Sequence, residues 1–302
     1  MDRLESMSLL VAAVEAGSLS AASRKLGTPL PTVSRKVSEL EAHLGTKLLL
    51  RSTRSLSLTD AGRSYLAACK RILEQVGEAE RAAAGEFSAP RGELAITAPV
   101  SFGRLHVLPV VLEFLQGHRE IDVQLALSDR VMNLLDDHVD LAVRIGELPD
   151  SGLIAIRVGE VRRVVCASPA YLKARGTPRE PGELASHDCV TFASLFSDTW
   201  QFAKGKATMP VGVHSRLVVN NADAAIDAAA AGIGITRVLS YQAAELLRTG
   251  KLQTLLDAHA PAAAPVSLLH AGGRLLPAKL RVFLDFAAPR LRARLAEIAA
   301  RA

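Results

Sequence analysis

Residues 31–45, with the sequence PTVSRKVSELEAHLG, carry the side chains best suited to chemistry outside the protein. Read as a helix, this segment buries one apolar face, formed by Val33, Val37, Leu40 and Leu44. Arg35 then points away from that face, and its guanidinium can donate to guanine O6 and N7 together, which discriminates between bases by ~1–3 kcal/mol. The alternative is an exposed Arg35 that pairs with Glu39 one turn later. The segment favours base edges in a DNA major groove as the partner of this face.

Short polar and basic side chains around this helix suit contacts to a nucleic-acid backbone. Thr32, Ser34 and Ser38 share the helix with Arg35, and we expect them to meet base edges or phosphates. For Ser34 and Ser38 the alternative is a solvated surface position. The expected phosphate contacts outside the helix are Ser18, Ser20, Arg51, Thr53 and Arg54. Such contacts fix the position of a protein on DNA rather than read its sequence.

The excess positive charge of the chain is concentrated around this helix. Lysine and arginine number 36 against 31 aspartates and glutamates, which gives a net charge of +5. Residues 24–54 alone hold seven cations and two anions, so the whole surplus of five fits inside them. A solvated charged surface is the alternative, but a local positive field beside a helix of this kind indicates a polyanion as partner.

The elements before this helix predict a helix-turn-helix. Residues 3–16 have an apolar face at helical spacing. Residues 19–26, LSAASRKL, predict a short second helix with Ser18 as its N-cap and Gly27 at its end. The turn TPLP then leads into the helix described above. In this arrangement the second helix of the pair enters a major groove while the first crosses the backbone.

A wing and a long helix are predicted next. Two short strands, near 47–51 and 55–58, form a hairpin whose tip carries the basic residues named above. Thr59 can N-cap a helix that runs to about residue 86. Its apolar stripe consists of Tyr65, Ala68, Ile72, Val76, Ala79 and Ala83. A stripe of this length has to be buried, against a second copy of the chain or, alternatively, against its own domain.

Beyond a linker at residues 85–92, GEFSAPRG, strands and helices alternate. The predicted strands are 93–97, 122–127, 139–145, 153–158 and 162–167, and the predicted helices are 103–117, 129–137, 169–175, 222–231 and 238–248. This alternation predicts an α/β domain with a largely parallel sheet. The remaining length of about 210 residues is large for one sheet and predicts two lobes.

The run AGSLSAASRKLGTPLPTVSRKVSELEAHLGTKLLLRSTRSLSLTDAG resembles the LysR-type transcriptional regulators. Over residues 4–66, the helix-turn-helix, the wing and the LTDAG entry to the linker helix follow the order and spacing of that family. The likeness continues more weakly to about residue 290, in segments such as GELAITAPVSFGRLHVLPVVLEFL and AAAAGIGITRVLSY. One departure is the turn, because Pro29 and Leu30 stand where members often carry serine and glutamine. Pro29 removes a capping side chain, a role that Thr28 or water could take, and Leu30 removes a base contact.

The resemblance implies a fold and its boundaries. A mostly helical winged helix-turn-helix domain would span 1–59, a linker and dimerisation helix 60–88, and a two-lobed α/β effector-binding domain of the periplasmic-binding-protein type 91–302. Lobe one would be about 91–163 plus 267–302, and lobe two about 164–266, with hinge segments near Val161–Val165 and Pro265–Leu268.

The resemblance also implies partners. It implies a bacterial transcriptional regulator, cytoplasmic and associated with the nucleoid, that binds double-stranded operator DNA in promoters. The chain would form a homodimer or homotetramer through the helix at 60–86, with RNA polymerase as a further partner. A small-molecule effector of unknown identity would bind between the lobes.

Candidate effector contacts follow the ends of predicted strands. Ligands in open α/β sheets bind beyond the carboxyl ends of strands, often at helix N-termini. Val100, Ser101, Phe102 and Ser128 follow predicted strands, and Arg144 and Ile145 end one. Two further candidates are Asn221, which precedes the predicted helix 222–231, and Thr236, which follows GIGI. Arg144 can pair with a carboxylate effector, and a structural salt bridge is an equal alternative. For Trp200 and Phe196 we expect the core of lobe two.

The sequence favours a protein that is not an enzyme and has no cofactor. It contains no G-x-S-x-G, H-E-x-x-H or P-loop motif, and GIGIT lacks the spacing of a dinucleotide fingerprint. Asp136, Asp137, His138 and Asp140 could mimic a metal site, but a solvated helix terminus is the expected interpretation. We therefore expect no metal.

Cysteines and apolar runs bear on the compartment. The three cysteines form no C-x-x-C pair and suit a reducing compartment. No signal peptide or membrane span is expected, so the sequence predicts a cytoplasmic protein. The remaining alternative is a cytoplasmic small-molecule-binding protein or enzyme of periplasmic-binding-protein fold whose N-terminal helices only oligomerise. Salt-sensitive DNA binding distinguishes the two interpretations.

Overall fold

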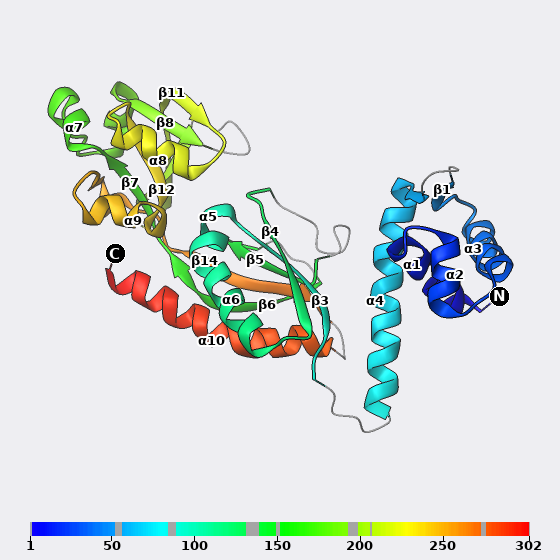
Figure 1. Cartoon of the computed structure of the whole chain (residues 1–302). Helices are drawn as coiled ribbons and strands as arrows, with labels where there is room; N and C mark the ends of the chain where they lie inside the picture. The colour runs from blue at the N-terminus through cyan, green and yellow to red at the C-terminus, as the bar shows by residue number, and fades with distance from the viewer. Residues whose placement is uncertain are drawn as a thin grey trace. The chain divides into compact units, whose positions relative to one another are not determined.

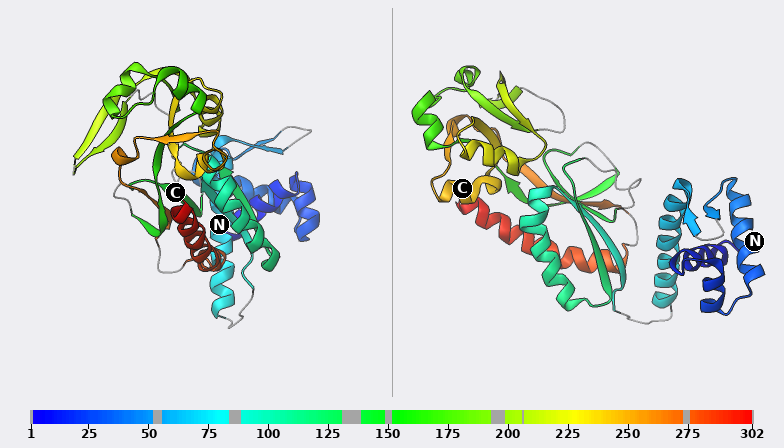
Figure 2. Two further views of the ribbon diagram at one scale, coloured as in Figure 1. Left: turned by 90° about the vertical axis from the view of Figure 1, so that its left-hand side faces the viewer. Right: turned by 45° about the horizontal axis from the view of Figure 1, so that its top comes forward.

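The chain divides into two compact units, Met1–Gly92 and Glu93–Ala302 (Figures 1 and 2). This computed structural model describes residues 2–51, 56–83, 89–130, 139–148, 152–192, 199–205, 207–272 and 276–301. The first unit is the predicted winged helix-turn-helix followed by a long helix, and the second is a two-lobed α/β unit. The predicted fold class is confirmed.

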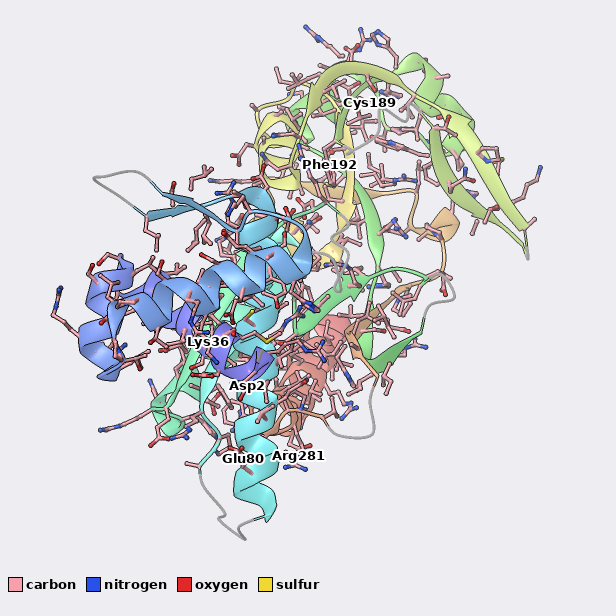
Figure 3. All side chains as sticks on the ribbon, turned by 90° about the vertical axis from the view of Figure 1, so that its right-hand side faces the viewer. Asp2, Lys36, Glu80, Cys189, Phe192 and Arg281 are labelled. Carbon is pink, nitrogen blue, oxygen red and sulfur yellow. The ribbon has the colours of Figure 1, made fainter. Side chains whose placement is uncertain are left out.

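The winged unit follows the order that its caps and apolar periods predict. Its elements are α1 (Arg3–Glu15), α2 (Leu19–Leu26), α3 (Leu30–Leu44), β1 (Leu49–Arg51), β2 (Leu56–Leu58) and α4 (Asp60–Ala83). The core joins α1, α3, β1 and α4 through Leu10, Val37, Leu40, Leu48, Leu49 and Cys69. Lys36 of α3 forms an ion pair with Glu5 of α1, which ties the two helices together outside this core. Figure 3 labels Lys36 on α3. Leu44, expected on the buried stripe, is 37% exposed because α3 ends there and Gly45 turns the chain away.

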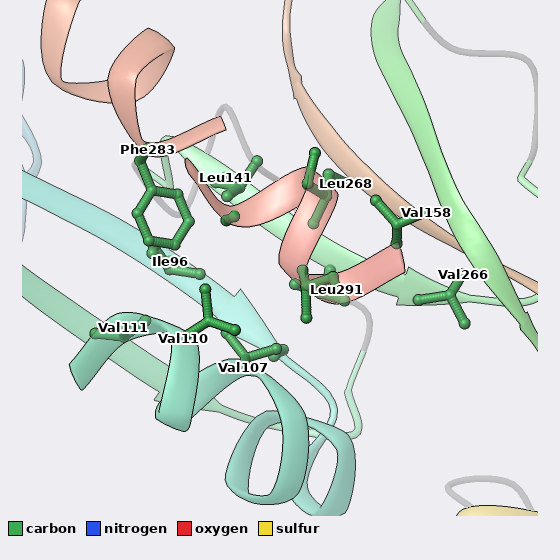
Figure 4. Close-up of a cluster of buried hydrophobic side chains, with 14 of the residues drawn as sticks. Ile96, Val107, Val110, Val111, Leu141, Val158, Val266, Leu268, Phe283 and Leu291 are labelled. Carbon is green, nitrogen blue, oxygen red and sulfur yellow. The ribbon is translucent and has the colours of Figure 1, made fainter. Parts of the chain in front are cut away.

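Lobe one is a five-stranded sheet covered by helices. Its strands are β3 (Gly92–Ala98), β4 (Ile121–Leu127), β5 (Leu141–Ile145), β6 (Leu153–Val161) and β14 (Ala264–Ala271), in the order β4-β3-β5-β14-β6. Its helices are α5 (Val100–Phe102), a π-helical turn η1 (Gly103–Val107), α6 (Leu108–Gly117) and α10 (Ala278–Arg301). Figure 4 shows Ile96 of β3, Val110 of α6 and Leu291 of α10 in one buried cluster.

Lobe two contains a second five-stranded sheet, with the order β11-β8-β12-β7-β13. Its strands are β7 (Arg163–Ala167), β8 (Asp188–Phe192), β11 (His214–Val219), β12 (Ile235–Leu239) and β13 (Gln253–Leu255), beside a hairpin of β9 (Thr199–Lys204) and β10 (Ala207–Gly212). Its helices are α7 (Pro169–Arg175), η2 (Pro181–Ser186), α8 (Ala222–Ala230), α9 (Ser240–Arg248) and η3 (Asp257–His259). The hairpin packs on one face of the sheet and α8 and α9 on the other (Figure 2). Trp200 lies in the hairpin-side core, as predicted, and Phe196 lies outside the described residues.

The expectation of a largely parallel sheet is wrong, because both sheets are mixed. The β3–β5, β8–β11 and β8–β12 pairs are parallel. In contrast, β14 runs antiparallel to both β5 and β6, and β7 runs antiparallel to both β12 and β13. These two strands directly follow the crossings of the chain between the lobes. Each enters its sheet from the side that faces the other lobe, and so it runs against the strands beside it.

Two chain connections join the lobes. The first connection is Arg162 alone, between β6 and β7, which lies in the segment predicted as a hinge. The second connection is residues 256–263, between β13 and β14. The other predicted hinge segment, Pro265–Leu268, lies instead inside β14, where it pairs with both β5 and β6.

Membrane-spanning helices and metal sites were also considered from the sequence. No single described helix is long and apolar enough to cross a membrane, and only α1 and α2 taken together, with a bend of 115° between them, meet that criterion. Within the described ranges no group of three or more metal-ligating side chains comes together. Asp136, Asp137 and His138 lie outside those ranges, and Asp140 accepts a hydrogen bond from the Ala95 N–H at 2.9 Å.

Candidate nucleic-acid interface and interlobe site

Local capping places the two helices of the helix-turn-helix. The Ser18 hydroxyl accepts a hydrogen bond from the Ala21 N–H at 3.0 Å, so its predicted N-cap role is confirmed. Gly27 ends α2 in the left-handed conformation with φ 64°, which glycine adopts without a steric penalty. No side chain caps α3, as Pro29 predicts, and Thr28 does not take over that role. Pro31 has no N–H, and the Thr32 and Val33 N–H groups donate to the Pro29 carbonyl at 2.9 and 3.1 Å, so the first turn of α3 uses these groups internally.

The outer face of α3 presents Arg35. Val33 and Val37 are completely buried on the opposite face, and the Arg35 side chain is 63% exposed. Its Nη1 donates to Glu39 Oε1 at 3.1 Å, which is the alternative pairing that the sequence raised. An exposed pair of this kind contributes little free energy, about 0.3–0.5 kcal/mol, so a stronger acceptor can displace Glu39. Thr32, Ser34 and Ser38 lie half-buried beside Arg35.

The folded winged unit neutralises part of the local positive charge. Besides Arg35, Lys36 is paired with Glu5 and Lys47 with Glu41. In contrast, Arg24 and Lys25 in the last turn of α2 form no ion pair with a described residue. Ser20 is exposed on the same helix. The positive charge left for a polyanion therefore includes the end of α2 as well as α3.

A buried carboxylate joins α3 to the wing. Glu41 is 3% exposed, and its Oε1 accepts from the Leu48 N–H at 2.9 Å and the Leu49 N–H at 3.1 Å. Its Oε2 accepts from Lys47 Nζ at 2.8 Å. Burial alone raises the pKa of Glu41, but the hydrogen bonds from Lys47, Leu49 and Leu48 outweigh it and hold the pKa below its ordinary value. Glu41 therefore stays charged and fixes the base of the wing.

The wing itself is a short antiparallel hairpin. Leu49 pairs with Leu58 and Arg51 with Leu56. Thr53 and Arg54 lie outside the described residues, as does the side chain of Arg51, so their phosphate contacts stay predictions. Behind the wing, a Cβ on Gly62 would lie 2.0 Å from the Leu48 carbonyl oxygen, so only glycine allows α4 to approach β1 this closely.

The long helix α4 is packed in its first half and open in its second. Thr59 Oγ1 accepts from the Gly62 N–H at 2.9 Å, which confirms the predicted N-cap. Cys69 is completely buried in the core of the winged unit, and Lys70 pairs with Glu15 of α1 at 3.1 Å. Ile72 is 38% exposed, and Ala79 is exposed as well. Packing on its own domain thus accounts for only the first part of the stripe.

In the second unit, polar groups from the two lobes meet at the N-terminus of α8. The Ser101 hydroxyl, at the start of the lobe-one helices, donates to Asp223 Oδ1 at 3.4 Å. Arg104 of η1 lies 3.9 Å from the other carboxylate oxygen of Asp223. Asn221 caps α8 by accepting from the Ala224 N–H at 2.8 Å. Two predicted effector residues, Ser101 and Asn221, therefore lie on opposite sides of this contact.

Val100 and Ser128 belong to the lobe-one side of the same region. The Val100 N–H donates to Asp129 Oδ1 at 3.0 Å, and the Ser128 N–H donates to the Ala98 carbonyl at 2.9 Å. These bonds join the end of β3 to the segment after β4. The carboxyl ends of neighbouring strands thus come together, as the sequence predicts.

Other predicted effector residues have structural surroundings. Phe102 is completely buried in the lobe-one core, and Thr236 is completely buried with its hydroxyl donating to the Val190 carbonyl at 3.0 Å. Neither side chain is exposed to a ligand in this structure. Ile145 is half-buried against the lobe-one core. Arg144 is half-buried, its Nη1 donates to the Val143 carbonyl at 3.1 Å, and burial lowers its pKa.

Three rings fasten the lobes to each other. Tyr241 of α9 in lobe two packs within the lobe-one core, with its ring centroid 5.5 Å from Phe102 and 5.2 Å from His106. His106 Nε2 is buried and has no hydrogen-bond partner among the described residues. Burial, and then the charge of Arg294, lower the pKa of His106 to about 4, so the imidazole is neutral near pH 7.

Four residues of these sites were not predicted from the sequence: Glu41, Arg104, Asp223 and Tyr241. Glu41 had a local signal, because it follows Val37 by four residues and so lies on the apolar face of α3. Asp223 also had one, as an acid in the first turn after the capping Asn221. For Arg104 and Tyr241 no local pattern indicates a contact across the lobes.

Comparison with known proteins agrees with this division. Residues 4–63 match the model of bacterial regulatory helix-turn-helix proteins of the lysR family, and residues 88–292 match the LysR substrate binding domain. An HTH-type transcriptional regulator of Xanthomonas campestris pv. campestris (strain 8004) is 35% identical over 94% of this chain and 84% of its own length.

Two solved structures of similar proteins extend over nearly the whole chain. CrgA from Neisseria meningitidis, a LysR-type transcriptional regulator, is 32% identical, with a TM-score of 0.61 over 95% of this chain and 98% of its own. The full-length Vibrio cholerae virulence activator AphB is 28% identical, with a TM-score of 0.61 over 94% of this chain and 98% of its own.

Proposed function

The chain belongs to the LysR-type family of transcriptional regulators, and from this premise we propose that α3 reads operator DNA through Arg35. The observation that carries the proposal is the exposed guanidinium opposite the buried Val33 and Val37. On DNA, Arg35 exchanges Glu39 for guanine O6 and N7, which form a bidentate acceptor. Thr32, Ser34 and Ser38 contact neighbouring base edges or phosphates.

Phosphate contacts position the helix in this proposal. They come from Ser18, Ser20, Arg51, Thr53 and Arg54. Arg24 and Lys25 at the end of α2, which form no ion pair with a described residue, add to the same positive surface. Because these groups neutralise phosphates and release counterions, binding should weaken steeply with salt.

A second copy of the chain covers the open half of α4 in our proposal. The exposed Ile72 and Ala79 belong to a stripe that its own unit leaves unburied, which supports a homodimer, with a homotetramer as the larger assembly. Two recognition helices would then bind half-sites about one turn apart, ~34–36 Å. RNA polymerase is a further proposed partner at promoters, in the bacterial cytoplasm and nucleoid.

We assign the effector unit to a small molecule that binds between the lobes and to no catalytic reaction or cofactor. Val100, Ser101, Ser128 and Asn221 are the proposed contacts. The effector acts by binding one arrangement of the lobes more tightly than another, since only differential affinity shifts such an equilibrium. Arg144 and Ile145 are the proposed contacts at the end of β5.

The test is a titration of the full chain against its own upstream DNA and against a scrambled duplex, each at several salt concentrations. We expect tighter binding to the upstream DNA and a log–log salt slope of roughly −0.9 for each phosphate contact. Equal affinity for both duplexes, with and without metabolites from a cell extract, would contradict sequence-specific recognition.

A further inference from the structure

The turn between α2 and α3 carries apolar side chains that the protein leaves open to solvent. Leu26, at the end of α2, is 43% exposed, and Leu30, the first residue of α3, is 40% exposed. Pro31 beside Leu30 is exposed as well. Neither leucine belongs to the apolar clusters formed by the described part of the winged unit. Both side chains are therefore available for a contact outside the protein.

Hydrogen bonds hold the backbone of this turn, so the position from which Leu30 projects is defined. The Ser23 hydroxyl donates to the Thr28 carbonyl at 2.6 Å, and the Thr28 N–H donates to the Ser23 carbonyl at 3.1 Å. The first turn of α3 then closes on the Pro29 carbonyl. A backbone that is already ordered loses little conformational entropy when it contacts a ligand.

Basic side chains accompany the two leucines on both helices. Arg24 and Lys25 lie in the last turn of α2, and Arg35 is exposed on α3. An exposed leucine alone is ordinary on a protein surface. In a helix-turn-helix, however, the N-terminal residues of the second helix contact base edges, whereas the first helix crosses the DNA backbone. This arrangement puts the exposed Leu30 among base edges and Leu26 outside them.

We propose that Leu30 selects a thymine in the operator by packing against its C5-methyl group. This methyl is the apolar group that the major groove presents, and the other bases offer hydrogen-bond donors and acceptors there. A leucine over such a polar edge would remove its water without replacing the hydrogen bonds, which is unfavourable. The contact depends on the proposed function, in which α3 reads DNA, and it adds a second base to the guanine read by Arg35.

The two contacts should lie close together in the operator. Leu30 and Arg35 are five residues apart, which is ~7.5 Å along a helix. Base pairs follow one another every ~3.4 Å, so the thymine should lie within about two or three base pairs of the guanine. Replacement of one thymine at a time by deoxyuridine locates the first base, and replacement of one guanine at a time by 7-deazaguanine locates the second.

The test compares the upstream DNA with the same duplex in which deoxyuridine replaces every thymine. This exchange removes methyl groups and no hydrogen-bonding group. The full-length wild-type protein should bind the deoxyuridine duplex about fourfold more weakly for each recognition helix, which is the effect of one buried methyl group. A scrambled duplex in both forms controls for altered DNA flexibility, and its affinity should change by less than about twofold because backbone contacts dominate there.

The matched variants are Leu30→Ala and Leu26→Ala, which each remove an exposed leucine side chain beside the same turn. Leu30→Ala should bind the thymine and deoxyuridine duplexes equally, whereas Leu26→Ala should keep the wild-type difference. Leu30→Gln should also lose the dependence on methyl groups, because a carboxamide can bind adenine N6 and N7 instead. Circular dichroism checks that each variant is folded.

Three results would overturn the proposed contact. They are an unchanged affinity of the wild type for the deoxyuridine duplex, the wild-type loss in Leu30→Ala, and a missing methyl effect in Leu26→Ala. If the wild type still prefers its upstream DNA to the scrambled duplex, only the Leu30 contact is wrong and α3 still reads DNA. Equal affinity of the wild type for these two duplexes would refute the proposed function, and the Leu30 contact with it.

Discussion

The winged unit and the effector unit differ in how completely their buried polar groups are hydrogen-bonded. In the winged unit, the carboxylate of Glu41 receives hydrogen bonds from Lys47 and from two backbone N–H groups. In the effector unit, His106 Nε2 is buried without a partner among the described residues, and Arg237 donates to a single carbonyl. A satisfied polar network fixes one conformation, whereas an unsatisfied group retains the capacity to bind another molecule.

This difference agrees with where each unit is proposed to bind its partner, on the outside of the winged unit and between the lobes of the effector unit. The winged unit keeps its interior satisfied and presents Arg35 on its outside, which suits a rigid surface that reads DNA. The effector unit holds polar groups between segments from both lobes, at the Ser101–Asp223 contact. A ligand that completes their hydrogen bonds can change the relation of the lobes without any change in the cores.

The largest effect is expected for Tyr241→Ala, which removes the ring that joins lobe two to the lobe-one core. Loss of a buried aromatic side chain should lower the free energy of unfolding of the effector unit by about 3–5 kcal/mol. Urea unfolding followed by Trp200 fluorescence measures this change. Tyr241→Phe keeps the contacts with Phe102 and His106 and is the control. A loss below about 1 kcal/mol in Tyr241→Ala would show that the rings do not fasten the lobes.

Glu41→Ala should have the largest effect in the winged unit. It leaves the Leu48 and Leu49 N–H groups buried without an acceptor, which should cost about 2–4 kcal/mol. Amide hydrogen exchange of residues 47–51 should rise accordingly, and DNA affinity should fall because the wing loses its support. The control is Glu39→Ala, whose exposed ion pair contributes about 0.5 kcal/mol or less. Unchanged exchange in Glu41→Ala would contradict the role of Glu41.

Acidification should destabilise the two units in different pH ranges. His106 has a pKa lowered from 6.5 to about 4, so the unfolded chain binds the proton first, and stability is lost as the pH falls from about 6.5 towards 4. Glu41 has a pKa below its ordinary 4.5, so its contribution is complete above that pH and is lost as the pH falls through the lower, folded value.

The effector unit should therefore weaken first on acidification. Two measurements in a pH series follow the stability of each unit. Thermal unfolding by Trp200 fluorescence reports on the effector unit, and hydrogen exchange at residues 48–49 reports on the winged unit. His106→Leu should remove the loss of stability of the effector unit between pH 6.5 and about 4. If the winged unit unfolded at a higher pH than the effector unit, the pH ranges assigned to His106 and Glu41 would be wrong.

The smallest effect is expected for Asp223→Asn. Asp223 and Arg104 are both about half exposed and 3.9 Å apart, so the lost attraction should change the free energy of unfolding by less than about 1 kcal/mol. The carboxamide oxygen of this variant would still accept from Ser101. Urea unfolding followed by Trp200 fluorescence is the measurement, and a loss above about 2 kcal/mol would mean that this contact, like Tyr241, is structural.

The sequence predicted those features that depend on neighbours along the chain. Ser18 and Thr59 cap helices as predicted, since capping involves residues two or three positions apart. The apolar period of α3 likewise placed Arg35 on the outer face. Residue type and spacing were sufficient because these features are local.

The contacts between the lobes could not be predicted in this way. Ser101 and Asp223 are separated by 122 positions, and Tyr241 reaches a core built from another lobe. The antiparallel entry of β14 depends on the return of the chain from lobe two, which no local pattern encodes. Phe102 was expected in the cleft because it follows a predicted strand, and Thr236 because it follows GIGI, but the burial of both depends on packing partners far along the chain.

The most direct test of the account is a comparison of Arg35→Ala and Glu39→Ala in binding to the upstream DNA and to a scrambled duplex. Arg35→Ala should lose about 1–3 kcal/mol of affinity for the upstream DNA and little for the scrambled duplex, because a base contact is removed. Glu39→Ala should bind the upstream DNA as tightly as the wild type or more tightly, because it frees Arg35 and removes a negative charge near the phosphates. Equal losses on both duplexes in Arg35→Ala, or no loss on either, would contradict the assignment of α3 as the helix that reads DNA.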